Sequence, residues 1–195
     1  MRYMPWFQNV AKVVVSTLYK IIYRIEITGR EHIPEGGCLV CGNHPGANDP
    51  LFVLTALGYK YEMSSMGKKE LYDKKWLAPI LIALGTFPVD RGNTDIKAIK
   101  QCFRDIKDGK KFILFPEGTR TKNSGKKAKA GVGLIAIKMG CPILPVYIDG
   151  SPKFFGKVKV TFGPCIIPPS RTEKVDNEVY SQYVLDTIFA MGETQ

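Results

Sequence analysis

From residue 24 onward, the spacing of hydrophobic residues switches back and forth between the period of a β-strand and the period of an α-helix. Short apolar runs typical of strands are separated by segments with helical spacing. The predicted strands cover residues 24–28, 38–42, 61–66, 86–90, 112–115, 143–148 and 158–162. The predicted helices cover residues 50–57, 76–84, 95–107, 132–139 and 173–191. This order predicts an α/β fold in which helices flank a largely parallel, mixed sheet, in a single domain over residues 24–195.

The first 23 residues have a different pattern. Apolar residues over positions 5–23 are interspersed with Lys12 and Lys20, and Arg24 follows, which predicts a basic amphipathic helix that lies on a membrane surface. No run of 18 apolar residues is present, so a spanning helix is not predicted. The uncharged segment 76–89 is interpreted as a core helix running into a strand rather than as a membrane-dipping element. We therefore expect a peripheral or monotopic protein on the cytoplasmic face of the cell membrane.

The net charge and the cysteine content indicate the class of partner and the redox compartment. The net charge of +10 indicates an acidic partner, which could be nucleic acid, an anionic membrane or a phosphorylated substrate. Five cysteines without a visible secretory signal favour a reducing compartment over a disulfide scaffold. Cys38 and Cys41 form a C-x-x-C, but on a strand they point to opposite faces, so buried structural thiols are expected.

The strongest chemical signal is His44, which stands five positions before Asp49 at the end of an apolar run. A neutral imidazole can accept a proton near pH 7, and a carboxylate on its other nitrogen fixes the tautomer. Pro45 keeps the histidine in an extended conformation, and Gly46 permits a tight turn between the two side chains. The other histidine, His32, lies near a Pro-Gly turn.

Each candidate site residue also has a structural interpretation. Asp49 precedes a proline, which is typical of a helix N-cap. Arg91 could bind a phosphate through two N–H groups or could be a solvated surface charge. Glu117 and Arg120 follow an apolar strand and could form a surface ion pair. Because these residues all follow strands, we expect them to converge on one cleft at the carboxyl edge of the sheet.

The lysine-rich segment after Gly118 resembles an anion-binding or mobile loop, with lysines at positions 122, 126, 127 and 129. Its spacing does not satisfy a G-x-x-x-x-G-K-[ST] P-loop, which argues against nucleotide hydrolysis. The sequence also lacks a G-x-S-x-G nucleophile elbow, which argues against a serine hydrolase.

Four segments together resemble the ordered blocks of the glycerolipid acyltransferase family. They are residues 43–49 with the H-x-x-x-x-D pattern, 85–91, 115–120 with the sequence F-P-E-G-T-R, and 141–146. The resemblance spans about residues 29–150, and four blocks in order are far more specific than any single one. Thr121 stands where many members have serine, which keeps the hydroxyl.

The resemblance implies an acyltransferase that moves a fatty acyl group from a thioester, on coenzyme A or acyl carrier protein, to a glycerol phosphate lipid. The first candidate acceptor is 1-acylglycerol 3-phosphate, and glycerol 3-phosphate or a lysophospholipid remain alternatives. His44 is implied as the general base and Asp49 as its orienting partner. The implied substrate-binding residues are Arg91, Glu117, Gly118, Thr119 and Arg120. No cofactor or metal is implied, and residues 142–146 are interpreted as an apolar wall.

We expect direct attack by the acceptor hydroxyl, with backbone N–H groups of residues 46–49 as oxyanion donors. A nucleic-acid-binding domain that uses Lys68, Lys69 and the lysines of residues 122–129 is a rival hypothesis, although no aromatic residues interleave with them. A lipid-binding protein that shares the fold without activity is a third.

Overall fold

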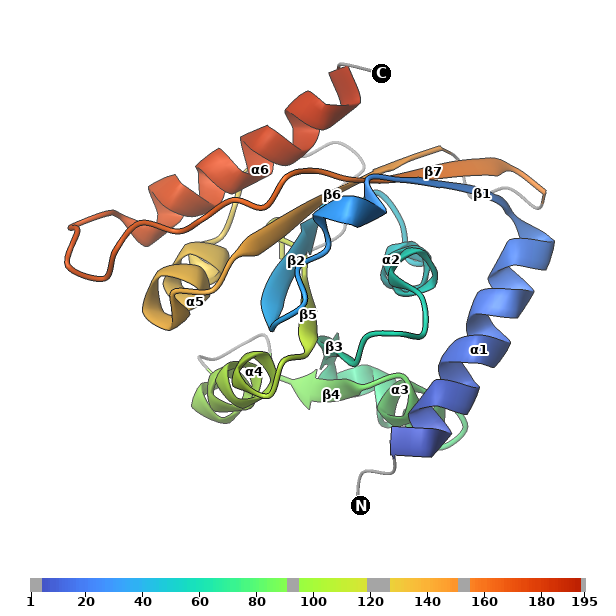
Figure 1. Cartoon of the computed structure of the whole chain (residues 1–195). Helices are drawn as coiled ribbons and strands as arrows, with labels where there is room; N and C mark the ends of the chain where they lie inside the picture. Colours follow the sequence, from blue (N-terminus) through green and yellow to red (C-terminus); the bar gives the residue numbers. More distant parts are fainter. Residues whose placement is uncertain (1–4, 91–94, 119–126, 151–154, 194–195) are drawn as a thin grey trace.

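One seven-stranded sheet organises the chain (Figure 1). The computed structural model describes residues 5–90, 95–118, 127–150 and 155–193. The strand order is β1-β7-β6-β2-β5-β3-β4, and neighbouring strands run parallel except for the antiparallel pair β6 and β7. The strands are β1 (Arg24–Thr28), β2 (Cys38–Gly42), β3 (Met63–Lys68), β4 (Thr86–Val89), β5 (Lys111–Leu114), β6 (Ile143–Asp149) and β7 (Lys157–Phe162).

Helices cover both faces of this sheet (Figure 1). The α-helices are α1 (Pro5–Ile22), α2 (Asp49–Leu57), α3 (Ala78–Ala83), α4 (Ile96–Lys107), α5 (Gly131–Met139) and α6 (Asn177–Glu193). Two short 3-10 helices, Arg30–His32 and Lys69–Leu71, were not predicted. Helices α1 and α2 share one hydrophobic core with the sheet, whereas α4, α5 and α6 share a second core on the opposite face. The predicted α/β class and single, mostly parallel sheet are confirmed.

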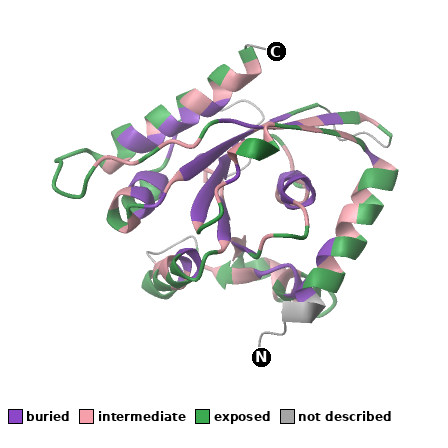
Figure 2. Cartoon of the chain, viewed as in Figure 1, coloured by how far each residue is buried: buried purple, intermediate pink, exposed green. Residues whose placement is uncertain are grey.

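Strand β2 lies at the centre of the sheet and is buried along its whole length (Figure 2). Its side chains alternate between the two cores, with Cys38 on the α1–α2 side and Cys41 on the α4–α6 side. Burial raises the pKa of the Cys38 thiol to about 12 and that of Cys41 well above its usual value. The prediction of buried structural thiols is therefore confirmed for this pair.

Element boundaries differ from the sequence predictions where polar side chains find specific partners. Strand β5 begins at Lys111, because the fully buried ammonium group donates to the carbonyls of Pro34 and Gly36. Helix α6 begins at Asn177, four residues later than predicted, because the Asp176 carboxylate accepts from the backbone N–H groups that follow it.

The helix predicted over residues 76–84 is present in part, but the prediction that it lies in the core is wrong. Helix α3 does run into β4, but Ala83 is its only buried residue, and Ile80 is 45% exposed. Trp76, just before the helix, is 67% exposed. This apolar segment therefore lies on the surface, beside α1.

Helix α1 packs against α2 through aromatic side chains. The rings of Tyr19 and Tyr23 meet the ring of Phe52 edge-on at 5.3 and 5.1 Å between centroids. Lys12 does not face solvent as the sequence suggested: it is 2% exposed, and its ammonium donates to the Tyr61 carbonyl at 3.0 Å. No helix within the described residues is long and apolar enough to cross a membrane.

Candidate active site

The H-x-x-x-x-D segment begins where the central strand β2 ends. Asn43, the first residue after the strand, is 5% exposed. Its side-chain amide donates to the Ile148 carbonyl at 2.9 Å and accepts from the Ile148 N–H at 2.8 Å. This pair of bonds ties the end of β2 to β6 and so fixes the backbone from which His44 projects.

His44 and Asp49 form the predicted pair. The Nδ1 atom of His44 lies 2.8 Å from Oδ2 of Asp49, and the two side chains are 11% and 3% exposed. The same carboxylate oxygen accepts from the Gly46 N–H at 2.6 Å, which closes the turn between them. The N-cap of α2 is Asn48, and Asp49 is the first residue inside the helix, so the interpretation of Asp49 as an N-cap is wrong.

This arrangement determines which ring nitrogen can act on a substrate. An ionised carboxylate can only accept hydrogen bonds, so Nδ1 of His44 is the donor and carries the proton. The Nε2 atom then presents a lone pair, and no described residue is within hydrogen-bonding range of it. A neutral imidazole with one oriented nitrogen and one available nitrogen is the geometry of a general base.

Residues after β5 hold the imidazole from another side. The ring of Phe115 stacks on that of His44, with centroids 4.2 Å apart and an interplanar angle of 18°. The Oε1 atom of Glu117 accepts from the His44 backbone N–H at 2.8 Å. Glu117 is only 8% exposed, so the alternative interpretation of it as a surface residue is wrong. Sequence reasoning missed Asn43 and Phe115 as supports, although each is the first residue of one of the four blocks.

Cationic side chains lie at the same carboxyl edge. Gly118 adopts a φ of 70°, and a Cβ atom there would lie 2.7 Å from Cδ of Lys129, so this lysine crosses the turn after β5. Lys68 ends β3, the strand next to β5. Three predicted substrate-binding residues, Arg91, Thr119 and Arg120, lie outside the described residues, as do the lysines at 122 and 126.

Part of the predicted oxyanion hole is already occupied. The Gly46 N–H donates to Asp49 and is not available to a substrate, which corrects the prediction for that residue. The next residues of the turn, Ala47 and Asn48, remain candidate donors through their backbone N–H groups. The Asn48 side chain donates to the Tyr23 hydroxyl at 3.4 Å, which links the turn to the end of α1.

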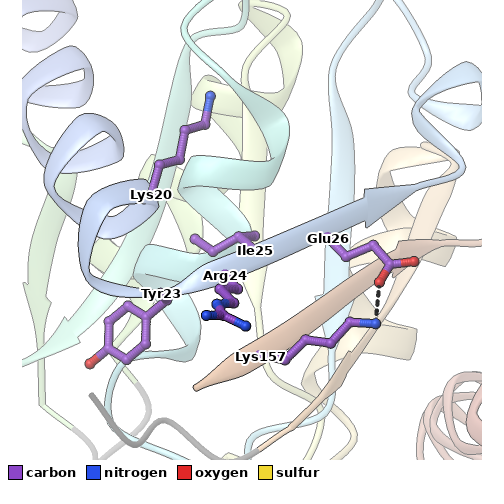
Figure 3. A pocket seen from close by; sticks show the side chains of 6 residues that line it. All are labelled: Lys20, Tyr23, Arg24, Ile25, Glu26 and Lys157. Atoms are coloured by element: carbon purple, nitrogen blue, oxygen red, sulfur yellow. Dashed lines mark ion pairs between the residues drawn. The ribbon is translucent and has the colours of Figure 1, made fainter. Parts of the chain in front are cut away.

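Two hollows lie elsewhere on the described surface. One of about 510 Å³ lies at the junction of α1 and β1, where Glu26 pairs with Lys157 at 2.7 Å (Figure 3). The other, of about 770 Å³, lies between α4 and the edge strand β4. Neither is lined by His44. Within the described residues, no group of three or more His, Cys, Asp or Glu side chains could hold a metal ion.

The largely buried His44–Asp49 pair thus lies at the carboxyl edge of a mostly parallel sheet. The acyltransferase family model matches residues 24–149, which contain the pair and the strands that carry it. The chain therefore belongs to the acyltransferase family and is an acyltransferase enzyme.

Individual relatives point the same way. The chain is 29% identical over 161 residues to a 1-acyl-sn-glycerol-3-phosphate acyltransferase of Bacillus subtilis, covering 80% of this chain and 78% of the relative. It is 29% identical over 157 residues to the enzyme of that name from Pseudomonas aeruginosa, covering 73% of this chain but 59% of the relative. A solved structure of the 1-acyl-sn-glycerophosphate acyltransferase PlsC from Thermotoga maritima has a TM-score of 0.71, covering 96% of this chain and 77% of that one, at 22% identity. This last likeness supports the fold.

Proposed function

We propose that the enzyme transfers a fatty acyl group from a thioester to the free hydroxyl of 1-acylglycerol 3-phosphate, which yields phosphatidic acid. The observation that carries the proposal is the 2.8 Å contact between Nδ1 of His44 and Asp49, which leaves Nε2 directed away from the carboxylate. The names of the relatives in Bacillus and Pseudomonas supply the substrate class.

In this mechanism the Nε2 atom of His44 removes the proton of the acceptor hydroxyl as its oxygen attacks the thioester carbonyl. A new C–O bond forms and a tetrahedral oxyanion develops, for which the N–H groups of Ala47 and Asn48 are candidate donors. Collapse of this intermediate breaks the C–S bond, and the imidazolium returns its proton to the thiolate. Asp49 stabilises the imidazolium between the two steps.

The acceptor phosphate needs cations near this edge. Arg91 and Arg120 remain the predicted ligands, and Lys129 joins them because its side chain crosses the turn at Gly118. Glycerol 3-phosphate and lysophospholipids would also present a phosphate group, so the site does not by itself distinguish them from 1-acylglycerol 3-phosphate. The family membership favours these lipid acceptors over the nucleic-acid-binding hypothesis.

The histidines allow a matched test. We expect His44→Ala to lower kcat by about 10²–10⁴-fold with 1-acylglycerol 3-phosphate and an acyl thioester, because general-base assistance is lost. His32→Ala removes the other histidine of the chain and should leave kcat within twofold. A folded His44→Ala enzyme that acylates at the parental rate would refute the proposed mechanism. Rates with glycerol 3-phosphate and a lysophospholipid as acceptors, measured in parallel, would identify the preferred acceptor.

We further propose that α1 binds the surface of an anionic membrane. Its outward face carries an apolar stripe, defined here as the five residues between 47% and 66% exposed: Val10, Val13, Val14, Leu18 and Ile21. Their spacing puts them on one side of the helix, opposite the face that packs against α2. Lys20 and Arg24 line the hollow at the end of the stripe, where anionic headgroups would find positive charge (Figure 3).

A flotation assay with liposomes that contain an anionic phospholipid tests this proposal. The variant Val14→Asp/Leu18→Asp should lose most liposome binding, because each substitution puts a charge into the apolar stripe. Val179→Asp/Tyr183→Asp on α6 changes two residues that are 67% and 54% exposed, and it should bind as the parent does. Equal binding by both variants would show that α1 is not the membrane contact.

A further inference from the structure

The hollow of about 510 Å³ at the junction of α1 and β1 is rich in positive charge (Figure 3). We call it the basic hollow, and it is lined by Lys20, Tyr23, Arg24, Ile25, Glu26 and Lys157. Glu26 is the acidic residue among them, and it pairs with Lys157 at 2.7 Å. Lys20 and Arg24 are not within ion-pair distance of any acidic side chain in the described part of the chain. Two of the three cations of the hollow are therefore not neutralised.

The basic hollow lies at the same edge of the sheet as His44. Strands β1 and β7 run parallel to each other, but β7 is antiparallel to β6, and β6 is parallel to β2. Arg24 and Lys157, the first residues of β1 and β7, therefore lie at the edge where β2 ends. Three strand spacings separate β1 from β2, which is about 14 Å. The free hydroxyl of the acceptor is only a few bonds from its own phosphate, so a phosphate in the hollow belongs to a second molecule.

Exposed apolar side chains adjoin the basic hollow. Ile21, which follows Lys20 in α1, is 66% exposed, and Phe155, two residues before Lys157, is 68% exposed. The Phe155 N–H donates to the Ile22 carbonyl at 2.9 Å, which joins the two segments. Phe155 has a φ of 59°, a backbone conformation that residues with a side chain seldom adopt. Apolar side chains beside cations that are not neutralised fit the boundary between lipid chains and charged headgroups.

Tyr23 connects the basic hollow to the turn that carries His44 and Asp49. Although it lines the hollow, Tyr23 is only 8% exposed, and its ring meets that of Phe52 in α2 at 5.1 Å. Its hydroxyl accepts from the side chain of Asn48 at 3.4 Å, and Asn48 is the N-cap of α2. The end of α1 thus supports the start of α2, where Asp49 lies.

The cations of the hollow belong to different elements. Lys20 is in α1, whereas Arg24 begins β1 and Lys157 begins β7 (Figure 3). A ligand held by all three requires the end of α1 to stay against the sheet, with Tyr23 in place. Such a ligand binds this arrangement better than one in which α1 has moved away, so it stabilises the arrangement that supports the turn.

We infer that the basic hollow binds the phosphate of an anionic membrane phospholipid other than the acceptor, and that this binding raises kcat through Tyr23. The inference rests on the proposed function, since it names a regulator of the same reaction. A guanidinium binds a phosphate through two N–H groups, and the lysines add point charges, so Arg24 is the main ligand. Tyr23 is a positioning residue, because it acts through Asn48 and not on the substrates.

Mixed micelles of a neutral detergent test the inference. The readout is the ratio of kcat with phosphatidylglycerol in the micelles to kcat with phosphatidylcholine in its place, with both substrates saturating. We expect a ratio of about five or more for the parent, which is the lower end of the usual coupling between two sites. In Lys20→Gln/Arg24→Gln the ratio should fall below two. Arg171→Gln/Lys174→Gln makes the same change in net charge at exposed positions before α6 and should keep the parental ratio.

The variant Tyr23→Phe separates binding of the lipid from its effect on the rate. It keeps the ring that packs on Phe52 and removes the hydroxyl that accepts from Asn48. Its kcat ratio should fall below two, whereas its flotation with phosphatidylglycerol liposomes should match that of the parent. A Tyr23→Phe enzyme that keeps the parental ratio, or that also loses liposome binding, would refute the positioning role.

Other outcomes would overturn the lipid site itself. A parental ratio below two would refute activation, and an equal loss of the ratio in both double variants would show an effect of net charge alone. If inorganic phosphate added to phosphatidylcholine micelles raises kcat as much as phosphatidylglycerol does, the hollow is a site for free phosphate. If Lys20→Gln/Arg24→Gln keeps the ratio and only raises KM for the acceptor, the hollow binds the acceptor. Failure of the proposed function is distinct, because the parent would then acylate 1-acylglycerol 3-phosphate in neither kind of micelle.

Discussion

The substitution Asp49→Asn tests the central contact of the site with almost no change in shape. In the parent, one carboxylate oxygen accepts from both Nδ1 of His44 and the Gly46 N–H, at 2.8 and 2.6 Å. An asparagine that points its NH₂ group at the ring would donate to Nδ1, which moves the ring proton to Nε2. A His44 side chain with that tautomer cannot act as a base at Nε2.

The contact between His44 and Asp49 determines how far kcat should fall in Asp49→Asn. If the asparagine instead points its oxygen at the ring, the hydrogen bond survives but the stabilising charge is lost, and such charge-assisted bonds contribute about 1.5–3 kcal/mol, or roughly 10- to 150-fold in rate. The wrong tautomer removes general-base assistance as well, which contributes about 10²–10⁴-fold. We therefore expect kcat to fall about 10²–10⁴-fold. KM should change little, because Asp49 is 2% exposed and lies behind the ring.

Steady-state acyl transfer to 1-acylglycerol 3-phosphate would measure both constants. Circular dichroism and thermal unfolding would establish that the variant is folded. Asp176→Asn is a matched control, because this aspartate also accepts backbone N–H bonds at a helix start but lies before α6. A folded Asp49→Asn enzyme with kcat within fivefold of the parent would refute the role assigned to Asp49.

Three further predictions concern the fold. A thiol reagent at pH 8 should label at most Cys165 of the five cysteines until denaturant is added, because the others are buried and burial raises the pKa of Cys38 to about 12; rapid labelling of two or more would contradict this. Burial raises the pKa of Tyr19 to about 12, so its contribution to stability is present below pH 10 and is lost as pH rises through 12. Between pH 9 and 11, the free energy of unfolding measured in urea should therefore fall less for Tyr19→Phe than for the parent, and equal falls would contradict this role of Tyr19. Gly133→Ala should destabilise by about 1–3 kcal/mol, because its Cβ would lie 2.2 Å from the Asn177 carbonyl oxygen; an unchanged urea midpoint would disprove that close packing of α5 and α6.

The sequence carried enough local information to predict the sheet and the histidine–carboxylate pair. Strand β2 is a continuous apolar run because it is covered on both faces, and such runs are recognisable without a structure. His44 and Asp49 are close in the chain, and Gly46 between them permits the turn. The rule that polar residues after parallel strands converge also placed Glu117 near His44 correctly.

What could not be predicted depends on partners far away in the chain. The bonds of Asn43 to Ile148 join residues 105 positions apart, and no local pattern indicates them. Lys111 looked like a residue before a strand, because its burial depends on carbonyl groups 75 and 77 positions away. The antiparallel pairing of β7 with β6 likewise follows from long-range contacts rather than from the spacing of apolar residues.

The central position of β2 has a consequence for how two unlike substrates meet. β2 is the fourth of seven strands, so His44 lies three strands from β1 and three from β4, or about 14 Å in each direction. Helix α1, which carries the apolar stripe, crosses one face of the sheet from α3 to β1, whereas α4 packs against β3, β4 and β5 on the opposite face. A lipid acceptor and a soluble donor could thus approach from different sides without competing for one surface. Substitutions in the apolar stripe should then change the KM of the lipid acceptor only, whereas substitutions at His44 should lower kcat for every pair of substrates.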